Sequence, residues 1–141
     1  MFSRTLKPAD AYNQVRIETG VPEANPHQLI LMLYDGAIHA LGLATQGLKS
    51  GDTPKKGRAI SNALDIISQG LQASLKIEEG GELAERLNAL YDYMCNRLLF
   101  ANLKNDLAAI EEVTGLLMNL RGAWGEMQSD TTASPVTRVV S

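Results

Sequence analysis

Four segments of this 141-residue chain place apolar residues at intervals of three and four, and short breaker sequences separate them. This spacing gathers the apolar side chains on one face of an α-helix. Each segment is about 20–25 residues long, or about 30–37 Å as a helix. Long helices joined by short connections pack antiparallel to their neighbours. We therefore expect an all-α fold, an antiparallel up-down four-helix bundle over residues 25–127.

The ends of these segments carry residues that start or stop helices. The first begins after Asn25, a good N-cap, with Pro26 at its first position, and Thr53-Pro54 repeats this start signal for the second. The pair Gly80-Gly81 predicts a tight reversal, after which the third segment begins near Glu82. Asn105 is the expected N-cap of the fourth segment.

Each segment has a main apolar line that is expected to face the core. The members are Ile30, Leu33, Tyr34, Ala37, Leu41, Ala44 and Leu48 in the first; Ile60, Ala63, Leu64, Ile67, Leu71 and Leu75 in the second; Leu83, Leu87, Leu90, Tyr91, Met94, Leu98 and Ala101 in the third; and Leu107, Ile110, Val113, Leu117, Leu120 and Trp124 in the fourth.

Two flanking segments lie outside the expected bundle. Residues 1–24 contain one weak helical turn around Tyr12 and Val15, which we interpret as a short N-terminal helical cap segment. Residues 128–141 are rich in serine and threonine and poor in bulky side chains, so disorder is expected there.

The composition excludes several classes of protein. The formal net charge of −3 provides no basic excess to hold a phosphate backbone, so we expect no nucleic-acid binding. The longest apolar run, Leu29 to Leu33, is far shorter than the roughly 20 residues that span a bilayer, so we expect no membrane insertion. The chain opens without a secretory signal pattern, and its single cysteine, Cys95, cannot form an internal disulfide. These features predict a soluble cytoplasmic protein.

The titratable residues predict neither an enzyme nor a metal or cofactor site. The two histidines, His27 and His39, belong to no Glu-x-x-His pair of the kind that di-iron bundles need, and one cysteine cannot build a zinc site. A phosphorelay bundle that uses His39 stays open as an alternative. The usual His-x-x-Lys-Gly pattern lacks its lysine here, because Gly42 occupies that position.

The helices carry more apolar surface than one buried face needs. A bundle helix requires an apolar stripe a little over 100° wide, and these segments have a second line beside the main one. Its members are Leu29, Met32, Gly36, Ala40 and Leu43 in the first segment; Ile66, Gly70, Ala73 and Ile77 in the second; Tyr93 and Phe100 in the third; and Leu116 in the fourth.

We interpret these second lines as a groove that receives a partner helix. Anchors of such a helix at i, i+3, i+4 and i+7 would dock where small residues permit close approach and where Met32 adapts to the partner. The cap segment is a candidate cover for the groove. The predicted partner-binding residues are Tyr12, Val15, Leu29, Met32, Gly36, Ala40, Leu43, Ile66, Gly70, Ala73 and Tyr93. An oligomeric helical adaptor, which would bury the second lines against its own copies, stays open.

An ordered series of short motifs over about residues 6–127 resembles the flagellar secretion chaperone FliS family. The motifs are AYNQV at 11–15, PHQLI at 26–30, MLYDGA at 32–37, GGE at 80–82, LYDYM at 90–94, the run from AN at 101–102 to ND at 105–106, and the run from EEV at 111–113 to AW at 123–124. Each motif alone is weak, whereas their order and spacing are specific.

This resemblance implies a cytoplasmic export chaperone. Members bind the disordered C-terminal segment of flagellin in hydrophobic grooves, prevent its premature polymerisation and assist its delivery to the flagellar type III export gate. The family's N-terminal segment, whose tyrosine matches Tyr12, occupies part of that surface in the absence of flagellin and is linked to recognition by the export-gate protein. The expected partners are the flagellin C-terminal segment and the export-gate protein. A homodimer in the absence of flagellin is left open.

Overall fold

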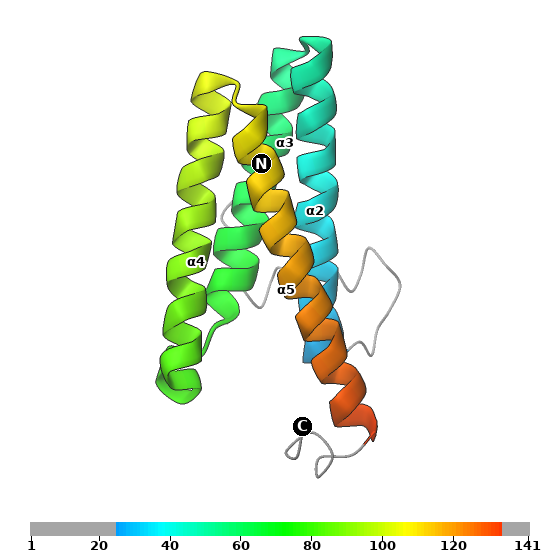
Figure 1. Ribbon diagram of the computed structural model, residues 1–141, viewed down its shortest axis with the longest axis vertical. Coiled ribbons are helices and arrows are strands. Elements are labelled where there is room, and N and C mark those ends of the chain that lie inside the picture. Colours follow the sequence, from blue (N-terminus) through cyan, green and yellow to red (C-terminus); the bar gives the residue numbers. More distant parts are fainter. Residues whose placement is uncertain (1–24, 134–141) are drawn as a thin grey trace.

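The computed structural model describes residues 25–133. The predicted cap segment with Tyr12 and Val15 and residues 134–141 lie outside the described residues. Four helical arms form the described part, and no strand occurs within it (Figure 1). They are α2 (Pro26–Ser50); α3 (Thr53–Asp65), continued by the π-helix η2 (Ile66–Leu71) and the 3-10 helix η3 (Gln72–Ser74); α4 (Ile77–Lys104); and α5 (Leu107–Ala133). The predicted all-α helical bundle is confirmed.

Capping residues define the start of α2 and the connection from α2 to α3. The Asn25 side chain accepts the N–H of Gln28 at 2.8 Å, as predicted for an N-cap. Gly51 ends α2 with φ 76, a left-handed conformation that glycine adopts without strain. The cap of α3 lies one residue earlier than predicted, because the Asp52 carboxylate accepts the N–H of Lys55 at 3.1 Å.

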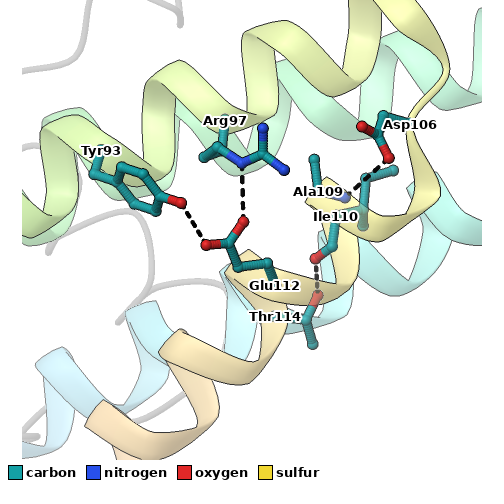
Figure 2. A network of polar contacts seen from close by, with 7 residues as sticks. All are labelled: Tyr93, Arg97, Asp106, Ala109, Ile110, Glu112 and Thr114. Carbon is teal, nitrogen blue, oxygen red and sulfur yellow. Dashed lines mark hydrogen bonds and ion pairs between the residues drawn. The ribbon is translucent and has the colours of Figure 1, made fainter.

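The later boundaries differ from the prediction at the start of α4 and at the connection between α4 and α5. α4 begins at Ile77, but Gly81 interrupts it with φ 60 and ψ −136, so regular helix runs only from about the predicted Glu82. Asn105 ends α4 in a left-handed conformation, φ 55, and therefore cannot begin the next helix. Asp106 caps α5 instead, and its carboxylate accepts the N–H of Ala109 at 3.3 Å (Figure 2).

The end of α5 lies beyond the boundary expected at residue 127, and the helix continues to Ala133. Neither glycine nor proline occurs between Glu126 and Ala133 to interrupt it. Part of the segment predicted as a disordered tail is therefore helical.

The main apolar lines meet in one core between the four arms. The largest fully buried side chains are Leu41, Ile60, Ile67, Met94, Leu98, Ile110, Val113 and Leu117, and all of them belong to the predicted lines. Leu83 is the clear exception: it is 64% exposed, because it lies at the start of the regular part of α4, next to the interruption at Gly81.

Two polar contacts of buried side chains connect the described arms. The hydroxyl groups of Tyr34 and Tyr91 form a hydrogen bond of 2.6 Å across the core. The Lys56 ammonium donates to the Asn102 carbonyl at 3.0 Å and to the Asn105 side chain, so it satisfies acceptors at the C-terminus of α4. Both contacts join different arms through residues that are distant in the sequence.

Within residues 25–133, α2 is the one helix whose length and composition would suffice to cross a membrane. It packs against α3 and α5, and seven of its residues are buried there. We therefore assign its apolar character to the core of the bundle.

Candidate functional site

Some members of the predicted second lines lie where α2 packs against the α3–η2 arm. A Cβ atom at Gly36 would lie 3.5 Å from Ile66 Cδ1, and one at Gly70 would lie 3.0 Å from Leu33 Cδ2. The small residues thus allow two helices of the same chain to approach closely. These small residues were expected to admit a partner helix, whereas here they lie between two helices of the same chain.

This packing changes the exposure of the predicted partner-binding residues. Ala40 is 1% exposed and Gly70 is also buried, so the prediction that they lie on an exposed line is wrong. The others fall into two groups: Leu29, Met32, Gly36, Leu43 and Ile66 are half-buried, whereas Ala73 and Tyr93 are exposed. Tyr12 and Val15 precede the described residues.

A polar clasp joins α4 and α5 near their connection. Glu112 of α5 accepts a hydrogen bond from the Tyr93 hydroxyl and a second from Arg97 Nε at 2.9 Å, both from α4 (Figure 2). From this end of the bundle the two helices separate towards the start of α4 and the end of α5 (Figure 1). We call Tyr93, Arg97 and Glu112 the clasp.

The separating halves of α4 and α5 are tied to other arms. Arg121 of α5 forms a bidentate ion pair with Asp35 of α2. One turn further, Trp124 Nε1 donates to the His27 carbonyl at 3.0 Å, and the two rings stack with centroids 4.5 Å apart. These contacts hold the second half of α5 against α2.

On the other side, the Gln72 amide of η3 ties α4 to the second arm. It donates to the Asn88 side chain at 2.9 Å and to the Asp92 carboxylate at 2.7 Å. The first half of α4 is therefore held against η3, away from α5.

Apolar side chains that the core covers only in part lie along the facing sides of α4 and α5. Leu116 and Leu120 follow Glu112 at intervals of four, and Leu90 precedes Tyr93 by three. Residues at these intervals lie on the same side of a helix, so these leucines share the sides of α4 and α5 that carry the clasp. The set comprises Leu87, Leu90, Tyr93 and Phe100 of α4 and Leu116, Leu120 and Met127 of α5, and we call it the α4–α5 surface. Its leucines are half-buried, while Tyr93, Phe100 and Met127 are 43%, 41% and 44% exposed.

The contacts of the clasp keep Glu112 ionised and the Tyr93 hydroxyl protonated at neutral pH. Hydrogen bonds from Tyr93 and Arg97 lower the pKa of the Glu112 carboxyl, and the hydrogen bond to Glu112 raises the pKa of the Tyr93 hydroxyl. The Arg97 guanidinium also lies 5.2 Å from the ring centroid of Phe100, in cation–π range. Of the two exposed aromatic rings of the α4–α5 surface, Tyr93 therefore belongs to the clasp and Phe100 contacts its Arg97.

The described residues offer little for catalysis or metal binding. No group of three or more His, Cys, Asp or Glu side chains in residues 25–133 is arranged to hold a metal ion. Burial raises the pKa of the Cys95 thiol, which keeps it protonated at neutral pH and weakens it as a nucleophile. His39 is exposed on α2.

The sequence predicted only some residues of the α4–α5 surface. Tyr93, Phe100 and Leu116 stand in the second lines, but the other leucines have main-line spacing and were assigned to the core. Periodicity cannot separate these cases, because their exposure depends on where α5 leaves α4.

The chain matches the family model described as "Flagellar protein FliS" over residues 8–131. It is 55% identical over 117 residues to the flagellar secretion chaperone FliS of Salmonella typhimurium, covering 83% of this chain and 87% of that protein. It is 43% identical over 120 residues to the flagellar secretion chaperone FliS of Escherichia coli K12, covering 85% and 88%. For the flagellar secretion chaperone FliS of Bacillus subtilis, the identity is 35% over 117 residues, covering 83% of each chain.

Proposed function

The chain belongs to the FliS family of flagellar secretion chaperones, and from this premise we propose that it binds the disordered C-terminal segment of flagellin on its α4–α5 surface. The family consists of chaperones and not of enzymes, so the phosphorelay alternative through His39 is set aside. Bound flagellin is kept from premature polymerisation in the cytoplasm and is delivered to the flagellar type III export gate.

One observation carries the proposal: two helices tied together at one end present facing rows of apolar side chains as they separate. A helical segment with apolar residues at i, i+3, i+4 and i+7 can cover both rows at once. The half-buried leucines need only a partner's side chains to complete their burial, at about 25 cal/mol per Å² of apolar surface removed from water. Folding on binding uses part of that gain for ordering, so the complex stays reversible for export.

The N-terminal segment and the export gate complete the proposed cycle. Residues 1–24, with Tyr12 and Val15, cover part of the apolar surface when flagellin is absent and take part in recognition by the export-gate protein. The half-buried Leu29, Met32 and Leu43 are secondary candidates for partner contact on α2. An oligomeric form that buries the α4–α5 surface against a second copy is the competing outcome.

Calorimetric titration of the full chain with the C-terminal segment of flagellin tests this function. We expect binding tighter than about 100 μM, or about −5.5 kcal/mol. Met127→Asp places a charge on the exposed end of the α5 row and is expected to weaken binding at least tenfold. Leu120→Gln is a second variant, provided that its helical signal equals that of the wild type.

Leu99→Asp is the matched control, because Leu99 is also exposed on α4 but projects about 100° away from Phe100 around the helix. It should bind like the wild type. Absence of binding by the wild type refutes the proposed function. An equal loss of affinity in Leu99→Asp and Met127→Asp places the binding surface elsewhere. The mass of the free chain in solution separates the oligomeric adaptor from a monomeric chaperone.

A further inference from the structure

The few aromatic side chains of this protein are unevenly distributed. The sequence contains two phenylalanines, four tyrosines and one tryptophan. In the described part, Tyr34 and Tyr91 are buried and Trp124 is half-buried, whereas Tyr93 and Phe100 are more than two-fifths exposed. Both exposed rings lie on α4, seven residues apart and thus on one side of the helix.

One carboxylate fixes both rings. Glu112 accepts the hydroxyl hydrogen bond of Tyr93 directly (Figure 2). Its other oxygen holds Arg97 Nε at 2.9 Å, and the Arg97 guanidinium lies over the ring of Phe100, 5.2 Å from its centroid. Figure 2 shows the Tyr93 and Arg97 side chains converging on Glu112 from α4.

We infer that Glu112 is a positioning residue that pre-organises Tyr93 and Phe100 as two aromatic anchors for the amphipathic helix of the export substrate. Aromatic residues carry a large share of the binding energy at protein interfaces, and they do so best when their side chains are already ordered. The inference rests on the proposed function and adds the residue that prepares the surface. In this inference, Glu112 does not contact the substrate helix and acts only through the two rings.

The geometry also defines the chemistry of the occupant. Seven residues of helix place the two anchors about 10 Å apart along α4, which suits apolar residues seven apart on the bound helix. Glu112 and Arg97 neutralise each other between the anchors. The matching part of the substrate is therefore apolar and needs no charge of its own.

A merely structural clasp, which only holds α5 to α4, makes a different prediction. If Glu112 acts through the two rings, its effect on affinity disappears once the rings are gone. If it acts by holding the helices together, its removal weakens binding equally with and without the rings. A double-mutant cycle on the full chain therefore separates the two roles.

The experiment is calorimetric titration of each variant with the C-terminal segment of flagellin. Glu112→Gln keeps the size of the side chain and is expected to weaken binding roughly three- to tenfold, the cost of ordering one or two side chains on binding. Tyr93→Phe, which keeps the ring and loses only the hydrogen bond, should weaken it in the same direction. Glu111→Gln removes the adjacent exposed carboxylate and should leave the affinity unchanged.

In the Tyr93→Ala/Phe100→Ala background, Glu112→Gln should cause no further loss. Thermal melting of every variant checks that the bundle is intact. The inference is overturned if Glu112→Gln binds like the wild type, or if it loses the same factor in the double-alanine background. A wild-type chain that does not bind the segment overturns both the proposed function and this inference. If the wild type binds but the Glu112 variants behave otherwise than expected, the inference alone fails.

Discussion

The buried hydroxyl pair of Tyr34 and Tyr91 gives the sharpest test of the fold. The two side chains are 3% and 2% exposed, and each hydroxyl finds its partner in the other at 2.6 Å. Replacing one tyrosine by phenylalanine leaves the remaining hydroxyl buried beside a ring that cannot bond it. Replacing both removes the two polar groups together and leaves an apolar core of almost the same shape.

The magnitudes follow from the cost of burying an unpaired polar group. Each single variant, Tyr34→Phe or Tyr91→Phe, is expected to lose about 1–3 kcal/mol of unfolding free energy, with about 2 as the central value. Independent effects would then give about 4 kcal/mol for the double variant. Since the double variant leaves no unpaired hydroxyl, we expect it to lie within about 1 kcal/mol of the wild type.

Urea titration of the four proteins at pH 7 measures this cycle, with circular dichroism as the signal and a common slope as the check for two-state unfolding. A double variant that loses the sum of the two single losses would refute the reasoning, because it would show that each hydroxyl has another partner. Singles that match the wild type would contradict it as well, because they would mean that water reaches the pair.

The same pair predicts a dependence on alkaline pH. Burial raises the pKa of both tyrosines above 10, first by desolvation and, for Tyr91, also through the neighbouring Tyr34. In the unfolded chain both ionise near pH 10, whereas in the folded chain they ionise only at higher pH. Stability from this source is complete below pH 10 and declines as the pH rises through the folded-state pKa values. The double phenylalanine variant should show a shallower alkaline decline.

Four further measurements each test a single feature of the structure. Lys56→Met is expected to lose about 1.5–3 kcal/mol in urea titration, because two acceptors at the end of α4 lose a charged donor, whereas Lys55→Met should change stability by less than about 0.5 kcal/mol. Gly47→Ala should lose about 1–3 kcal/mol, since its Cβ would lie 2.7 Å from the Lys56 backbone nitrogen. Gly122→Ala, with nothing within 4 Å of its Cβ, should gain about 1 kcal/mol in the same measurement. Cys95 should react with iodoacetamide at pH 7.5 more slowly in the folded chain than in 8 M urea, as followed by mass spectrometry; equal rates would contradict its raised pKa.

Periodicity predicted the core well because a helix face is a local property of the sequence. Leu41, Ile60 and Leu117 have to lie inward wherever the neighbouring helices are, since each stands in the middle of an apolar line. The interval between apolar residues does not say which neighbour covers them. Gly36 and Gly70 signalled a close helix approach, yet only the fold reveals that the approaching helix belongs to the same chain.

The candidate site was harder to predict, since it depends on the relative directions of two helices. Leu120 has the spacing of a core residue but is only half-buried. Figure 1 shows that α5 separates from α4 towards its end, a direction that the sequence does not reveal. The connection shows a similar limit. Asn105 and Asp106 are both good capping residues, and the positive φ of Asn105 decides which of them begins α5.

The hydrogen bonds of Trp124 and Gln72 to other arms explain why α4 and α5 stay apart along the α4–α5 surface. Closing α5 onto α4 would bury more leucine surface, but it would pull Trp124 from His27 and α4 from the Gln72 amide, leaving partly buried donors without their present acceptors. Helices are also stiff over this length, so α5 cannot follow α2 and α4 at once. The leucines keep one side on the core, which limits the exposed area and thus the tendency to aggregate. In the proposed function, an incoming helix completes their burial without breaking these polar contacts, so binding leaves the bundle intact.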